Sequence, residues 1–204
     1  ADAATGKIRL VDYQDAAISG VTITLVCSAF GVAFVQQNPT TPPEIYAGIM
    51  GNSAGMVRVS AANNDYREMA LGKTEVVKWK SKDGREIEGL LTYPVGYAAG
   101  SKVPLILNVH GGPAGVFQQN FLGGRGSYPI ATFASRGYAV LRPNPRGSSG
   151  YGTEFRRANF KDWGGNDYED LMSGVDKVIA MGVADPDRLG VMGWSYGGYM
   201  TSTI

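Results

Sequence analysis

A five-residue stretch near the C-terminal end places the strongest constraint on how this chain can fold. Residues 193–197 read Gly-Trp-Ser-Tyr-Gly and directly follow the apolar run 189–192. This order predicts a strand, a sharp turn with Ser195 at its apex, and then a helix. The turn is too tight for a Cβ at the positions two before and two after the serine, and Gly193 and Gly197 have none. The fold must therefore join a strand to a helix through a glycine-lined serine turn.

The serine turn also predicts chemistry. A G-x-S-x-G turn between strand and helix is typical of the nucleophile elbow of α/β-hydrolases, whose serine attacks an acyl carbon and forms an acyl-enzyme. The helix N-terminus behind Ser195 favours developing negative charge. We expect two oxyanion donors. One is the backbone N–H of Tyr196, and the other is that of Gly111 in the His-Gly-Gly-Pro loop at 110–113.

From Thr74 onward, alternating strand and helix patterns predict an α/β fold with right-handed crossovers. A helix over 167–181 is the clearest helical element, because its apolar residues fall at i, i+4, i+7 and i+8. A shorter helical face covers 130–134. We expect the helix over 167–181 to begin with Asn166 or Asp167 as its N-cap. The predicted strands are 75–80, 85–93, 103–109, 138–141 and 189–192.

The first 72 residues show only strand and turn patterns. Residues 38–43 contain three prolines, so no strand is expected to continue through them. Short strands at this spacing suit a sandwich, a barrel or a propeller blade. We therefore predict two domains, an all-β segment at 1–72 and an α/β domain at 73–204. The predicted strands of the first are 21–26, 32–36, 44–49 and 56–60, with a turn at 51–55.

Composition narrows the possible partners. The 204 residues carry a net charge of +1, which gives no reason to expect nucleic acid or an anionic membrane surface. Residues 16–35 are uncharged and long enough to span a bilayer. Their β-branched alternation and the interruptions at Gly20 and Gly31 instead favour two strands, so we predict no membrane partner. The single cysteine, Cys27, precludes an internal disulfide and is expected to be a small core residue.

His110 is the only histidine, yet it is not expected to be the general base. Triad partners in this fold follow the serine in chain order, as an acid and then a histidine. Only nine residues follow Ser195, and none of them is Asp, Glu or His. We expect His110 to be a hydrogen-bonded residue of the oxyanion turn, with a substrate contact as the alternative.

Arg146 lies in the glycine-rich segment 144–152, which follows a buried strand. Loops at this end of an open α/β sheet face the ligand crevice, so Arg146 could bind a substrate carboxylate or carbonyl. We slightly favour the other possibility, that it holds the loop in place. No metal-ligand spacing, phosphate-binding loop or dinucleotide fingerprint is present, so neither a metal nor a cofactor is predicted.

Four motifs in this order resemble the prolyl oligopeptidase family of serine peptidases, particularly its acylaminoacyl-peptidase and dipeptidyl aminopeptidase branches. The motifs are 110–113, 144–148, 151–152 and 193–200. The resemblance implies a β-propeller ahead of an α/β-hydrolase domain, and an oligopeptide substrate. It also implies that Ser195 is the nucleophile, with Tyr196 and Gly111 as oxyanion donors.

The resemblance further implies that the catalytic Asp and His lie beyond Ile204. Residues 1–72 would be the last propeller strands, and 73–204 the N-terminal half of the hydrolase domain. We therefore expect this chain to be an internal piece of a longer enzyme, poorly soluble and inactive by itself, because a serine without its base loses orders of magnitude in rate.

Two other functions stay open. A carboxylesterase or lipase of the same fold would pass through the same kind of tetrahedral intermediate. A non-catalytic hydrolase-like protein could use the fold for binding. Cleavage-site preference, endo- or exo-cleavage and oligomeric state are not determined by the sequence, and the cytoplasm is only slightly favoured as compartment.

Overall fold

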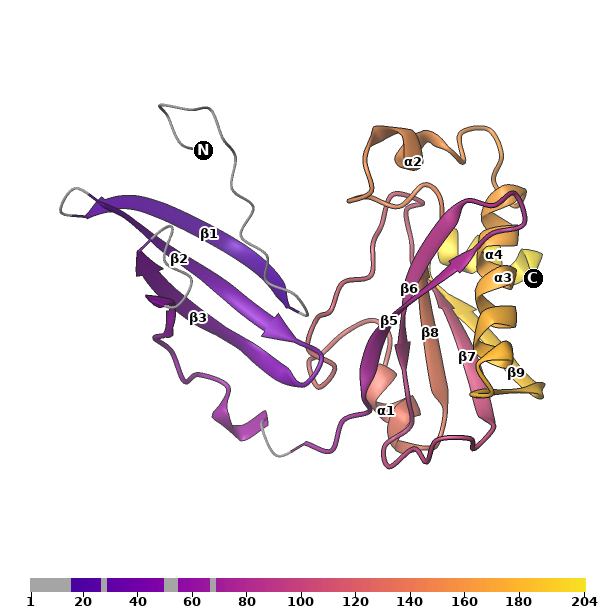
Figure 1. The fold of residues 1–204 in the computed structure, drawn as a ribbon, viewed down its shortest axis with the longest axis horizontal. Coiled ribbons are helices and arrows are strands. Elements are labelled where there is room, and N and C mark those ends of the chain that lie inside the picture. Colours follow the sequence, from indigo (N-terminus) through magenta and orange to yellow (C-terminus); the bar gives the residue numbers. More distant parts are fainter. Residues whose placement is uncertain (1–15, 27–28, 50–54, 67–68) are drawn as a thin grey trace. The chain divides into compact units, whose positions relative to one another are not determined.

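The computed structural model describes residues 16–26, 29–49, 55–66 and 69–204, and the chain divides into two compact units (Figure 1). The first comprises Ala1–Met69 and Gln119–Gly124. The second comprises Ala70–Gln118 and Arg125–Ile204. The break after Met69 lies close to the boundary expected at residue 72. Cys27 and most of the turn expected at 51–55 lie outside the described residues.

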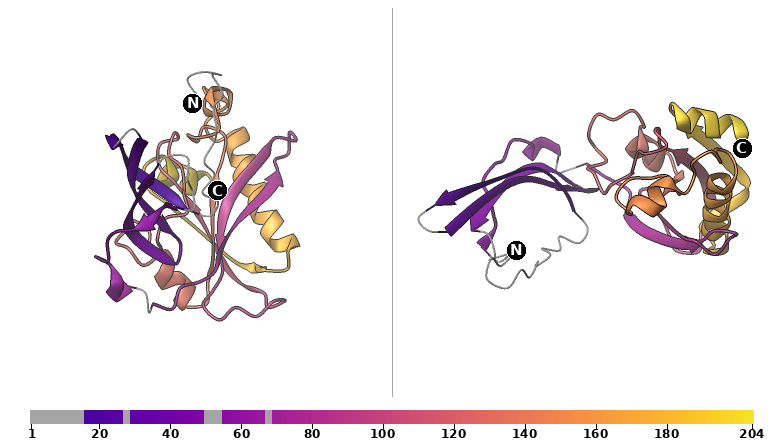
Figure 2. Two further views of the ribbon diagram at one scale, coloured as in Figure 1. Left: turned by 60° about the vertical axis from the view of Figure 1, so that its left-hand side comes forward. Right: turned by 90° about the horizontal axis from the view of Figure 1, so that it is seen from above.

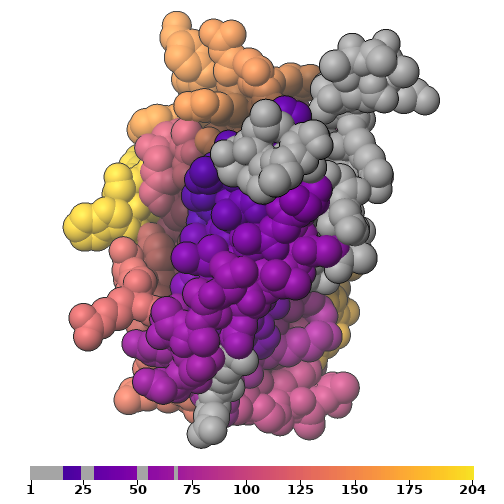
Figure 3. Space-filling model, turned by 90° about the vertical axis from the view of Figure 1, so that its left-hand side faces the viewer, coloured from indigo at the N-terminus to yellow at the C-terminus, as the bar shows by residue number. Residues whose placement is uncertain are grey.

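The first unit is built on a four-stranded antiparallel sheet in which neighbours in sequence are neighbours in space (Figures 1 and 2). Figure 3 shows this unit in space-filling form. Residues 17–38 form two of its strands, which confirms the two-strand interpretation of the uncharged stretch. Among the described residues, none of the helices has the length and apolar character needed to cross a membrane. The strands are β1 (Ala17–Val26), β2 (Ala29–Asn38), β3 (Thr41–Ile49) and β4 (Val57–Arg58).

The loop predicted at 38–43 is wrong, because only Pro39 and Thr40 form the turn and β3 already begins at Thr41. Pro42 and Pro43 therefore lie within a strand. Proline is tolerated where its missing N–H is not needed, at strand starts and bulges. Pro42 and Pro43 lie close to the start of β3, beside a register shift in the β2–β3 pairing between Gln36 and Asn38. On the other side, β4 pairs with β3 only at Tyr46 and Ala47, so the prolines have no strand neighbour there among the described residues.

The second unit is a five-stranded mixed sheet in the order β5-β6-β8-β7-β9 (Figure 1). The β5–β6 and β6–β8 pairs are antiparallel, whereas β8, β7 and β9 run parallel, as the α/β prediction requires. Gly84, at φ 86°, turns the chain between β5 and β6. The strands are β5 (Thr74–Lys80), β6 (Glu86–Thr92), β7 (Val103–Val109), β8 (Ala139–Asn144) and β9 (Ala184–Gly193). The helices are α1 (Ile130–Ser135), α2 (Thr153–Arg157), α3 (Asn166–Ala180) and α4 (Tyr196–Thr203).

The main core of this unit lies between the sheet and helices α3 and α4. Strand β7 contributes alternate residues to it, and α3 contributes its predicted apolar stripe. Gly174 lets α3 approach the sheet closely, since a Cβ there would lie 2.7 Å from the Trp79 ring. The core members from these elements include Leu105, Leu107, Val109, Leu171, Val175 and Val178.

Helix α3 begins one residue earlier than predicted, and its N-cap residue is Gly165 rather than Asn166 or Asp167. The backbone N–H of Asn166 donates instead to the Asp162 carboxylate, at 3.1 Å. Asp167 instead accepts hydrogen bonds from the backbone of Gly164 and Tyr168 and from the Tyr196 hydroxyl.

Candidate active site

Ser195 lies at the apex of the predicted turn, between the end of β9 at Gly193 and the start of α4 at Tyr196. Its backbone has φ 60° and ψ −121°, a conformation that non-glycine residues rarely adopt. Such conformations cost on the order of 1–3 kcal/mol and persist where the surrounding structure imposes them. The side chain is exposed, so a substrate can reach its hydroxyl.

The two glycines of the motif are required by close backbone contacts. A Cβ on Gly197 would lie 2.1 Å from the carbonyl oxygen of Val109 in β7. A Cβ on Gly193 would lie 2.3 Å from the carbonyl oxygen of Gly197. Both distances are far below van der Waals contact, so α4 can pack against β7 and β9 only because these side chains are absent.

We expect Gly197→Ala in the full-length protein to lower the free energy of unfolding by about 1–3 kcal/mol, the usual cost of overpacking. Its methyl group would push α4 away from β7. Gly198→Ala is the matched control on the same helix, because its Cβ would meet nothing closer than 3.7 Å. That variant should be neutral or slightly more stable, since alanine favours helix. Urea unfolding checks both, and equal midpoints for the two variants would contradict the packing argument.

The structure brings the two expected oxyanion donors to Ser195. Gly111 lies against the serine, since a Cβ there would be 3.4 Å from Ser195 Cβ and 4.0 Å from its Oγ. Tyr196 directly follows the serine, at the first position of α4. Within the described residues, neither N–H donates to another group. Both are therefore available to a negatively charged oxygen formed at Ser195.

Tyr128 holds the serine turn against β7, the strand that precedes the loop carrying Gly111. Its hydroxyl donates to the carbonyl oxygen of Val109 at 3.2 Å and accepts from the backbone N–H of Trp194 at 3.0 Å. Burial raises the pKa of this hydroxyl, so it stays protonated and able to donate at neutral pH. The bridge fixes Ser195 relative to the loop that carries Gly111.

The side chain of Tyr196 is held by a buried carboxylate and by a neighbouring aromatic ring. Its hydroxyl donates to the buried carboxylate of Asp167, which also accepts backbone N–H groups of Gly164 at 2.8 Å and Tyr168 at 2.9 Å. Burial, and then Asp167, strongly raise the pKa of the Tyr196 hydroxyl. The Trp163 ring packs edge-on against Tyr196, with the ring centroids 5.4 Å apart. The peptide unit that carries one proposed donor is thus held by a neutral, buried phenol.

Both ring nitrogens of His110 lie within hydrogen-bond distance of groups other than Ser195. Its Nε2 lies 3.0 Å from Ser148 Oγ, and its Nδ1 lies 2.9 Å from the carbonyl oxygen of Gly111. Ser148 in turn donates to the carbonyl oxygen of Pro145, at 2.7 Å. Burial lowers the pKa of the imidazole, and the hydrogen bond to the Gly111 carbonyl opposes this shift. This geometry fits the role of holding the oxyanion turn and gives no support to the substrate-contact alternative.

Arg146 is 3% exposed, and its guanidinium is occupied by two carboxylates. Its Nε and Nη2 donate to Asp170 at 2.9 and 2.7 Å, and Nη1 and Nη2 donate to Asp83 at 2.8 and 3.0 Å. The Arg146 guanidinium lowers the pKa of Asp83 to about 2. Arg146 therefore ties the loop after β8 to α3 and to the β5–β6 turn, and the substrate-binding alternative does not fit its surroundings.

Sequence reasoning missed Asp167, Asp170 and Trp163, and treated residues 163–167 as a helix start without chemistry. Asp167 and Asp170 are three residues apart on the buried side of α3, and both are fully buried. Two aspartates at i and i+3 on an otherwise apolar helix face were the signal in the sequence. Buried carboxylates need hydrogen-bonding partners, so such a pair predicts polar contacts from other segments.

A serine elbow of this geometry on a sheet of this strand order defines the class of the second unit as an α/β-hydrolase. Residues 126–204 match the family model of the prolyl oligopeptidase family. The chain belongs to the prolyl oligopeptidase family.

Three relatives illustrate this similarity. An uncharacterized peptidase, YuxL of Bacillus subtilis, is 38% identical over 168 residues, covering 81% of this chain and 24% of its own length. Dipeptidyl aminopeptidase BIII of Pseudoxanthomonas mexicana is 37% identical over 146 residues, covering 65% of this chain and 20% of its own. A solved acylaminoacyl peptidase in complex with Z-Gly-Gly-Phe-chloromethyl ketone has 28% identity and a TM-score of 0.81, covering 98% of this chain and 30% of that one.

These similarities confirm the predicted fold class, an α/β-hydrolase fold with all-β strands before it. The chain spans only a fifth to a quarter of the length of the two curated relatives. It therefore corresponds to part of such a protein, and the activity and substrates of the whole protein are treated below as proposals.

Proposed function

We propose that the full-length protein is a serine peptidase that hydrolyses short peptides through an acyl-enzyme on Ser195. The observation that carries this proposal is the position of Gly111 against Ser195, with the N–H groups of Gly111 and Tyr196 both free of other acceptors among the described residues. In the proposed reaction the serine oxygen attacks the peptide carbonyl carbon, and these two N–H groups stabilise the resulting oxyanion. A single donor of this kind typically contributes about a hundredfold or more in rate.

The general base is assigned to the part of the parent protein beyond this chain, together with its orienting carboxylate. His110 does not fit that role, because its ring is buried and lies against Ser148 and the Gly111 carbonyl. The same proposal assigns residues 1–72 to the end of a β-propeller and 73–204 to the N-terminal part of the catalytic domain. Under it, the isolated 204 residues carry a nucleophile without its base.

A peptide substrate is supported by the relatives. One relative is named a dipeptidyl aminopeptidase, and the solved acylaminoacyl peptidase is in complex with Z-Gly-Gly-Phe-chloromethyl ketone. We extend this substrate class to the present protein as part of the proposal.

Paired substrates test the proposal against its alternatives. The full-length protein is given peptide p-nitroanilides and p-nitrophenyl esters with the same acyl part, and is labelled separately with a fluorophosphonate. A peptidase should release nitroaniline, and peptide mapping should find the phosphonate on Ser195. If the phosphonate labels Ser195 but only the esters are cleaved, the protein would instead be an esterase. Absence of both labelling and hydrolysis would indicate a non-catalytic binding protein.

A further inference from the structure

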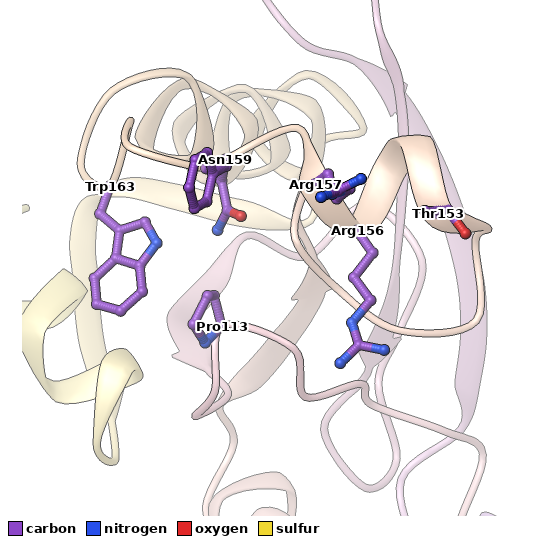
Figure 4. A pocket seen from close by; sticks show the side chains of 7 residues that line it. Pro113, Thr153, Arg156, Arg157, Asn159 and Trp163 are labelled. Atoms are coloured by element: carbon purple, nitrogen blue, oxygen red, sulfur yellow. The ribbon is translucent and has the colours of Figure 1, made fainter.

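A cavity of about 390 Å³ lies beside the proposed oxyanion loop (Figure 4). Its lining includes Pro113, Arg156, Arg157, Asn159 and Trp163, and we call it the arginine pocket. Figure 4 shows Arg156 extending from α2 toward the loop that carries Pro113, with Trp163 on the opposite side. Pro113 is two residues from Gly111, and the Trp163 ring packs on Tyr196, so the pocket adjoins both proposed donor residues.

The charged residues that line the pocket are all positive. Arg156 and Arg157 are exposed, and neither forms an ion pair with any carboxylate in the described part of the chain. No Asp or Glu lines the pocket. Arginine guanidinium groups match the geometry of a carboxylate, with which they form paired hydrogen bonds.

Asn159 adds a buried donor without a partner. The residue is 3% exposed, and its Nδ2 makes no hydrogen bond within the described residues. The side chain is held against Gly147, where a Cβ would lie 2.4 Å from Nδ2 and where φ is 101°. It also partly offsets the rise in the Tyr196 pKa, although the two groups lack hydrogen-bond geometry. Because Nδ2 is shielded from solvent, Asn159 shapes the pocket, and the two exposed arginines are the donors that a ligand can reach.

Apart from Thr153, the remaining lining is apolar. Pro113, Phe160 and Trp163 offer hydrocarbon and aromatic surface next to the donors. A ligand that fits both the arginines and the apolar surface carries a carboxylate on a short hydrocarbon chain. Acidic amino-acid side chains and the C-terminal residue of a peptide both have this form.

We propose that the arginine pocket binds a carboxylate of the peptide substrate and selects peptides that carry one near the scissile bond. The inference rests on the proposed function and specifies its substrate class. Arg156 and Arg157 pair with the carboxylate, since they are the exposed charged side chains of the lining. The carboxylate comes either from a Glu or Asp side chain or from the free C-terminus.

Four peptides distinguish these two sources in the full-length protein. They share one sequence, carry Glu or Gln beside the scissile bond, and end in a free acid or an amide. We expect kcat/KM to favour one of the two carboxylates over its neutral counterpart by about tenfold or more, as for hydrogen bonds to charged groups. Because both arginines are exposed, the preference should shrink as salt is added.

A double variant that combines Arg156→Gln and Arg157→Gln tests the pocket, and Arg136→Gln is its control. Arg136 is an exposed arginine at the C-terminal end of α1, so it shares the helix-end position of the pocket arginines without lining the pocket. The double variant should lose the carboxylate preference, whereas the control should keep it. A preference that survives in the double variant, or equal cleavage of all four peptides, would overturn the proposal.

Calorimetric binding to the Ser195→Ala variant separates this inference from the proposed function. Arginine-dependent binding of the acidic peptide to this variant, together with no hydrolysis by the unsubstituted protein, would support the pocket and reject the peptidase. Hydrolysis that depends on Ser195, with equal binding of acidic and neutral peptides, would support the peptidase and reject the pocket.

Discussion

Replacing Ser195 by alanine in the full-length protein is expected to lower kcat/KM for a peptide substrate by a factor of about 10⁴ or more. In the proposed reaction the Ser195 hydroxyl oxygen forms the acyl-enzyme, and no other described residue lies in an equivalent turn. The substitution should not disturb the elbow, because alanine is no more strained than serine at φ 60°. The loss should therefore appear in kcat with the fold intact, as measured by steady-state kinetics and circular dichroism.

Ser202 provides the control for this prediction. It lies on the same helix, is exposed, and its Oγ donates only to the Gly198 carbonyl oxygen, at 3.2 Å. Ser202→Ala should leave kcat/KM within about twofold, since surface substitutions of this kind perturb little. A Ser195→Ala variant with more than a tenth of the parental activity would rule out Ser195 as the nucleophile.

Asp170→Ala is expected to lower the free energy of unfolding by about 3–5 kcal/mol, because it leaves a buried guanidinium without its main partner. Asp170 is fully buried and accepts hydrogen bonds from the Arg146 backbone N–H, Nε and Nη2, at 2.8, 2.9 and 2.7 Å. Asp83, the other partner, cannot replace it, since it approaches the opposite side of the guanidinium. Urea unfolding of the full-length protein measures the effect.

Asp83→Ala is the matched control, because it removes the exposed carboxylate from the same arginine. The Asp83 side chain is 42% exposed, so solvent screens the pair and the expected cost is about 1 kcal/mol or less. The lowered pKa means that this contribution is present above pH 3.8 and is lost as the pH falls through about 2. Equal losses for the two variants near pH 7 would show that burial does not set the strength of these pairs.

Much of the second unit was predictable because its local patterns agree with its tertiary structure. Strand β7 is almost wholly apolar, with Asn108 as its one polar residue, and it forms at Val103–Val109 as expected. The elbow was predictable for the same reason, since strand, glycines and serine all specify one turn. In the first unit, Pro42 and Pro43 led to a wrong loop, because the sequence does not reveal which side of a strand lacks a hydrogen-bonding neighbour.

The supporting residues of the site were less predictable, because they depend on contacts between distant segments. Trp163 and Tyr196 are far apart in sequence but pack ring against ring. Asp170 meets Arg146 only once α3 lies beside the loop after β8. The burial of Asp167 and the unpaired amide of Asn159 likewise arise from packing, which periodicity and motif spacing do not specify.

Helix α3 connects two parts of the candidate site through a single turn of backbone. Asp167 holds the phenol beside the nucleophile, and three residues later Asp170 holds the arginine of the loop after β8. A small sliding motion of this helix would therefore shift the serine turn and the glycine-rich loop together and in the same direction. Substitutions at remote points of the helix, such as Gly174 under the Trp79 ring, would then alter reactivity mechanically, without touching a substrate.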